Sequence, residues 1–224
     1  GPAPGYTSAQ AMAALETVAG TTLPSGMGYA WANMSFQEQQ AAGTGAIVFV
    51  FSLLFVFLIL AAQYESWSLP LSILLGTPFA IFGAFLALYL ARMVSSSYEL
   101  NIFAQIALVM LIGMAAKNAI LIVEFANQEF NQGLSLFDAA VKAAGLRFRP
   151  ILMTAFSFIL GVLPLVVASG AGAEARVVMG MALLGGMAMA TTLGVFFYPM
   201  LFVLVGKIAG YEKKRDRPKA METR

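Results

Sequence analysis

The run IFAQIALVMLIGMAAKNAILIVE, residues 102–124, decides the fold because it places a lysine, Lys117, inside a segment apolar enough to cross a bilayer. No other side chain between Ile102 and Val123 is ionisable, and a membrane-spanning helix needs about 20 predominantly apolar residues. A lysine near the centre of such a helix costs roughly 2.5 to 3.5 kcal/mol on insertion scales. The run therefore predicts a transmembrane helix whose lysine needs a partner or an aqueous cavity.

The depth of Lys117 bears on two interpretations of this lysine. On an ideal helix it lies about 7 Å beyond the midpoint of residues 102–123, which leaves about 8 Å to the edge of a ~30 Å hydrocarbon core. An extended lysine could nearly snorkel over that distance. Helical side chains lean towards the helix N-terminus, however, which tilts this one towards the bilayer centre. We therefore interpret Lys117 as a buried functional cation, with snorkelling as the alternative.

The composition indicates a membrane protein, with 60% hydrophobic and 11% charged residues and a mean hydropathy of +0.82, whereas soluble domains carry about 25% charged residues. The net charge is only +2 and the basic residues gather after Leu204, so we expect no nucleic-acid partner. The absence of Cys and His removes disulfides, thiol nucleophiles, zinc sites and imidazole acid-base groups. We expect no metal, no cofactor and no enzyme activity.

Five apolar runs predict five transmembrane helices, so the predicted fold class is a mainly α, polytopic membrane protein. A less hydrophobic piece lies between the third and fourth runs, with an apolar face set against Asp138 and Lys142, and it predicts an amphipathic helix on the cytoplasmic surface. The expected spans are about 43–63, 69–91, 102–124, 150–168 and 176–205, and the amphipathic helix is about 133–146.

Residues 1–40 are the soluble-looking part of the chain. Residues 8–19 have apolar side chains at helical spacing behind a capping residue, Thr7 or Ser8, and residues 27–33 alternate as a strand would. One helix and one strand cannot bury a core alone, so we expect the C-terminal remnant of a periplasmic α/β porter subdomain. Residues 35–38, SFQE, fit a capping box that leads into the first membrane helix.

Basic residues predict the orientation, because they concentrate in the tail and in the 124–149 connection, which should both be cytoplasmic. An odd number of spans then places residues 1–40 and the loops at 92–101 and 169–175 on the outer side. The expected domains are 1–40, the transmembrane bundle 41–205 and a basic cytoplasmic tail 206–224. The chain begins with neither Met nor a signal peptide, which predicts a C-terminal fragment of a longer protein.

Two further polar residues lie near the depth of Lys117. Thr154 is about 7 Å from the bilayer midpoint on the cytoplasmic side, and Arg147 is about 10 Å nearer the cytoplasm on the same helix face. Alone, Thr154 would be a back-bonded helix threonine and Arg147 a positive-inside anchor. The five spans contain no acid that could pair directly with Lys117, so we expect its carboxylate partner to come from sequence outside this chain.

Several long motifs together resemble the resistance-nodulation-division (RND) multidrug efflux transporters, in particular their hydrophobe/amphiphile branch. The resemblance covers nearly the whole chain except the charged tail. In chain order the motifs are YESWSLP (64–70), KNAILIVEFA (117–126), RPILMT (149–154), ILGVLPL (159–165) and SGAG (169–172).

The resemblance implies a proton-driven exporter of hydrophobic or amphiphilic drugs in the inner membrane of a Gram-negative cell. It implies a homotrimer that works with a periplasmic adaptor and an outer-membrane channel and is powered by the proton motive force. In that family the matching lysine pairs with two neighbouring aspartates in the N-terminal half. The resemblance carries the proton relay over to Lys117, Arg147 and Thr154. Asn118, beside the lysine, is a further candidate for the relay.

The chain departs from the family pattern because it lacks the two aspartates, the first seven spans, the docking domain and most of the drug pocket. Two other functions stay open: an RND exporter of another cargo, such as lipid or metal, and a non-transporting assembly subunit in which Lys117 docks a partner helix. An intramembrane enzyme is disfavoured, since the chain has neither a His-Glu-x-x-His nor a Gly-x-Ser-x-Gly motif.

Overall fold

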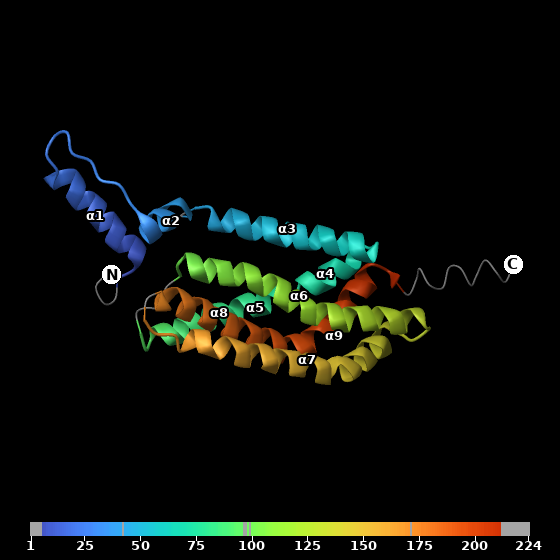
Figure 1. The fold of residues 1–224 in the computed structure, drawn as a ribbon. Helices are drawn as coiled ribbons and strands as arrows, with labels where there is room; N and C mark the ends of the chain where they lie inside the picture. Colours follow the sequence, from blue (N-terminus) through green and yellow to red (C-terminus); the bar gives the residue numbers. More distant parts are fainter. Residues whose placement is uncertain (1–5, 42, 96–97, 99, 171, 212–224) are drawn as a thin grey trace.

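The computed structural model describes residues 6–41, 43–95, 98, 100–170 and 172–211, and these residues form nine helices and no strand (Figure 1). The long helices α3 and α5 to α8 lie side by side as a bundle, with the short helices α1 and α2 at one end. The helices are α1 (Ser8–Thr22), α2 (Asn33–Ala41), α3 (Gly45–Tyr64), α4 (Ser68–Leu74), α5 (Thr77–Arg92), α6 (Ile102–Asn131), α7 (Leu136–Val166), α8 (Ala173–Thr192) and α9 (Gly194–Ile208).

The number of predicted spans is confirmed, because five segments are long and apolar enough to cross a membrane. They are Gly45–Tyr64, Ser68–Arg92, Ile102–Asn131, Leu136–Val166 and Ala173–Thr192, with Gly194–Ile208 as a shorter apolar helix. Two of the expected spans are interrupted. The second breaks at residues 75–76, just before Pro78, and the fifth breaks at Leu193 between α8 and α9.

The expected α/β remnant at the N-terminus is wrong for the residues that the structure describes. Thr7 caps α1 through a capping box with Gln10, as expected, but residues 27–32 form no strand. A strand is defined by pairing with a neighbour, and this stretch has no second strand beside it, so the Tyr29 and Trp31 alternation has nothing to pair with. Ser35 does not cap the first span either, because it lies inside α2.

Residues 133–146 are arranged differently from the expected surface helix. They belong mostly to α7, which continues without a break through Pro150 to Val166 and packs against the end of α6. The side chains of Leu136, Ala139, Ala140 and Ala143 are buried in one cluster with Ala126 and Phe130 of α6. Proline inside a helix costs about 3 kcal/mol, and this packing offsets that cost.

The connections between the helices lie alternately at the two ends of the bundle, as an odd number of spans requires. At one end Tyr211 stacks on Phe130, with ring centroids 6.1 Å apart, and its hydroxyl lies 3.3 Å from that of Ser66. At the other end a cavity is lined jointly by Glu38, Asn101 and Gly172. The assignment of these ends to the cytoplasm and the periplasm stays a prediction.

Small residues bring α5 and α8 into close contact. A Cβ added at Gly83 would meet the Cβ of Met189 and the backbone of Gly185, and one added at Gly185 would meet Ala87. Small residues on both helices therefore let α5 and α8 pack closely, as they commonly do between membrane helices. By contrast, α3 packs little against the other helices, and Leu60 is its one buried residue.

Candidate functional site

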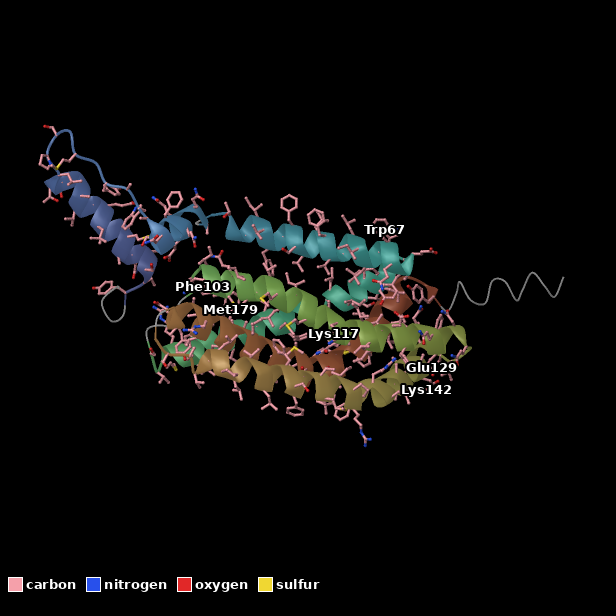
Figure 2. All side chains as sticks on the ribbon, viewed as in Figure 1. Trp67, Phe103, Lys117, Glu129, Lys142 and Met179 are labelled. Carbon is pink, nitrogen blue, oxygen red and sulfur yellow. The ribbon has the colours of Figure 1, made fainter. Side chains whose placement is uncertain are left out.

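Lys117 lies midway along α6 (Figure 2), and its side chain is exposed in the described structure. The neighbouring residues Ala115, Ala116 and Ala119 are buried against the bundle, and this fixes which face of α6 turns inward. Within the described residues, the Lys117 ammonium has no hydrogen bond and no ion pair. An unpaired lysine in this position is an expensive feature of a membrane helix.

Asn118, the next residue, points into the core instead. Its side chain is 1% exposed, and neither amide atom has a hydrogen-bond partner in the described part of the chain. Buried polar atoms are normally paired, so the amide of Asn118 needs an explanation beyond packing.

Arg147 lies on α7 and is held against α6 by an aromatic ring. Its guanidinium carbon is 3.5 Å from the centroid of the Phe125 ring, which is a cation–π contact. Its Nε atom is buried and has no hydrogen-bond partner among the described residues. The contact places the charge against Phe125, which directly follows the apolar run that carries Lys117.

Thr154 also lies on α7, on an exposed face. Its hydroxyl donates to the carbonyl of Ile151 at 3.0 Å, the local bond expected of a helix threonine. The oxygen keeps lone pairs that can accept a hydrogen bond. The hydroxyl is therefore able to receive a proton donor from outside its own helix.

The structure joins none of these four residues to another by a hydrogen bond or an ion pair, within the ranges it describes. The proton relay of Lys117, Arg147 and Thr154 stays a prediction. The ion pair that the described residues do contain joins Lys142 Nζ to Glu129 Oε2 at 2.7 Å, near the tip of the α6–α7 hairpin (Figure 2).

Sequence reasoning missed this ion pair and one further polar contact. Glu129 lies near the end of α6 and Lys142 in the second turn of α7, and because the two are 13 positions apart, no i,i+3 or i,i+4 spacing indicated their pairing. The hydroxyl of Tyr198 donates to the carbonyl of Ala115 at 3.4 Å. No sequence pattern predicted that contact, because it joins residues 83 positions apart.

A profile of the AcrB/AcrD/AcrF family matches residues 1–206. The chain belongs to the AcrB/AcrD/AcrF family. The RND resemblance is thereby confirmed, and the match extends from the N-terminal helices of this family member almost to the end of α9.

Curated relatives of this family member are efflux transporters and not enzymes, in agreement with the expected absence of enzyme activity. It is 48% identical over 209 residues to the toluene efflux pump membrane transporter TtgB of Pseudomonas putida, covering 93% of this chain and 19% of the relative. It is 43% identical over 204 residues to the multidrug export protein AcrF of Escherichia coli, covering 91% of this chain and 19% of the relative. The chain thus spans about a fifth of the length of these relatives.

Proposed function

We propose that this chain is the C-terminal part of a proton-driven exporter of hydrophobic or amphiphilic molecules, and that Lys117 is the cation of its proton relay. The observation that carries the proposal is the unpaired ammonium of Lys117 on the apolar helix α6, within the chain as described. Because the relatives are about five times longer, the exposed face around Lys117 is where the remainder of such a protein would supply a carboxylate.

The relay works through the charge of that carboxylate. With its oxygens within ~4 to 6 Å of Nζ, the lysine favours the ionised acid, and protonation of the acid removes the attraction. The helices that carry the pair can then shift relative to one another. Thr154 supplies a hydroxyl on the neighbouring helix and Arg147 a second cation towards the cytoplasmic end, while Asn118 holds the adjacent position of α6 in the core.

Relatives favour hydrophobic cargo over lipid or metal. Their names specify toluene, solvents, antibiotics and multiple drugs. We extend that cargo class to this chain, together with a trimeric assembly in the inner membrane that engages a periplasmic adaptor and an outer-membrane channel. In this arrangement the end that carries α1 and α2 is periplasmic and the end after α9 is cytoplasmic.

The test is export from proteoliposomes under an imposed pH gradient, with the complete transporter carrying Lys117→Met. We expect normal expression and trimerisation with loss of proton-coupled export, because a thioether cannot pair with the acid. Lys117→Arg should also be weak, since a planar guanidinium does not replace a compact ammonium in a packed site. The matched control is Lys207→Met, which removes an exposed lysine in the last turn of α9 and should leave export unchanged.

Each other outcome of this experiment has a defined meaning. Near-normal export by Lys117→Met would overturn the relay assignment and return Lys117 to the snorkelling interpretation. Loss of trimers by the same variant would instead favour the assembly subunit, in which the lysine docks a partner helix.

A further inference from the structure

Four polar side chains from four different helices are buried in the middle of the bundle. They are Thr77 of α5, Asn118 of α6, Thr191 of α8 and Tyr198 of α9, each no more than 4% exposed. The Tyr198 hydroxyl is paired with the Ala115 carbonyl. The hydroxyls of Thr77 and Thr191 and both amide atoms of Asn118 have no partner among the described residues.

The helix contacts place these orphaned groups at one level. Ala80 of α5, Ala115 of α6 and Ala190 of α8 form a single buried cluster. Thr77 precedes Ala80 by three residues and Asn118 follows Ala115 by three, while α5 runs antiparallel to α6 and α8 (Figure 1). Each step of three residues is about 4.5 Å along the helix axis, and because the helices run in opposite directions both steps lead towards the same end of the bundle. Thr191 lies one residue beyond Ala190 towards that same end.

The ring of Tyr198 borders this region. A Cβ added at Gly76 or at Gly194 would overlap the ring, so both glycines are in direct contact with it. These glycines mark the two helix interruptions, α4 to α5 and α8 to α9. Pro78 has no N–H for the carbonyl four residues earlier, and broken backbone at membrane depth is tolerated only where other groups or ordered water satisfy it.

The two threonines differ from the other hydroxyls in the long helices. Ser52, Ser157 and Thr192 each donate to the carbonyl four residues earlier, at 2.7, 2.9 and 2.8 Å. Thr191, which lies inside α8, makes no such bond, although hydroxyls inside a helix often form one. Thr77 is the first residue of α5, and its hydroxyl has no partner among the described residues either. Their hydroxyls are available to another ligand.

We propose that Thr77, Asn118 and Thr191 enclose a binding site for ordered water between α5, α6 and α8. Water fits because it both donates and accepts, and the site offers hydroxyls, an amide oxygen and an amide nitrogen. A metal ion does not fit, because the Asn118 nitrogen is a donor and cations such as Ca²⁺ require several oxygen ligands, usually with carboxylates. The site does not depend on any relay role of Lys117.

The direct test is a density map of the full-length protein at a resolution that shows buried waters elsewhere in the bundle. We expect a water peak within hydrogen-bond distance of the Thr77 hydroxyl or the Asn118 amide. A map that resolves other buried waters but has no peak at this position would overturn the proposal.

A second test uses the sign of a stability change, measured as the melting temperature of the full-length protein in nanodiscs. Thr77→Val and Thr191→Val keep the side-chain volume and remove the hydroxyl. If water binds there, each variant should melt at a lower temperature, and the double variant should lose less than the sum because both changes act on one site. Removing a truly unsatisfied buried hydroxyl is neutral or stabilising, so an unchanged or raised melting temperature would contradict the proposal.

The matched control for this series is Thr192→Val. Thr192 is the residue next to Thr191, but it is exposed and its hydroxyl is bonded to the Ala188 carbonyl. Its replacement should leave the melting temperature nearly unchanged. A fall as large as that of Thr191→Val would mean that the loss of any hydroxyl here destabilises the helix, and the water site would be rejected.

Discussion

At the residue scale, two basic side chains near the turn between α6 and α7 are held by different kinds of contact. Arg147 is stacked over Phe125, whereas Lys142 is paired with the nearly buried carboxylate of Glu129. Lys117 has neither kind of contact in the described chain. This difference separates cations that stabilise the hairpin from the one whose partner we place outside this chain.

The Arg147 contact leads to a prediction about Phe125. Phe125→Leu keeps an apolar side chain but removes the ring, and it should destabilise the α6–α7 hairpin by about 0.5 to 2 kcal/mol. The measurement is the melting temperature of the full-length protein. The control is Phe137→Leu on α7, where the side chain is 66% exposed and makes no described ring contact. Equal effects of the two variants would show that the cation–π contact contributes nothing.

The ion pair leads to a prediction of coupling. Lys142→Met leaves Glu129 nearly buried without its cation and should destabilise by about 1 kcal/mol, between the values typical of exposed and buried pairs. Glu129→Gln should cost a similar amount, and the double variant should cost less than the sum. A double-mutant cycle measures this, and strict additivity would mean that the 2.7 Å contact is energetically silent.

At the element scale, the number of membrane spans follows from the sequence, but the ends and interruptions of the helices do not. The apolar run around Lys117 predicted α6 correctly because a spanning helix needs little beyond length and hydropathy. Pro150 led us to place the start of the fourth span too late. The preference of proline for a helix start is overridden here by the burial of Leu136 and its neighbours against α6. Residues 27–33 misled the N-terminus because an alternating pattern indicates a strand only where a partner strand exists.

The candidate site, too, could be predicted from the sequence only in part. The identity and depth of Lys117 and Thr154 are readable from the chain, since both depend on position along a helix. The direction in which Lys117 faces, and the orphaned state of Asn118, depend on how helices distant in sequence pack together, and no local pattern records that.

The close contact between α5 and α8 predicts that substitution by alanine has opposite effects on stability at two glycines. Gly83→Ala should lower the melting temperature, at a cost of about 1 to 3 kcal/mol, because the added methyl meets the Met189 side chain and the Gly185 backbone. Gly161→Ala on α7 should raise it, by up to about 1 kcal/mol, because nothing lies within 4 Å of its Cβ position and alanine favours a helix. Equal responses would contradict the close contact.

At the scale of the whole molecule, the helices alternate between two ends, so loops at opposite ends should face opposite compartments. The chain has no native cysteine, which makes single-cysteine labelling unambiguous within it. Ser169→Cys should react with an impermeant thiol reagent in intact cells, and Gln132→Cys only after permeabilisation. Both residues are exposed. Reaction of both from the same side would overturn the topology.

Helix α6 is continuous over its whole length and can act as a rigid element. Its 30 residues extend about 45 Å, well beyond a ~30 Å hydrocarbon core, whereas the second and fifth expected spans are interrupted near Gly76 and Gly194. A continuous helix transmits a displacement along its whole length, whereas an interrupted helix absorbs part of it at the break. A displacement of α6 at Lys117 would therefore be transmitted to Asn131, about 21 Å further along the same helix.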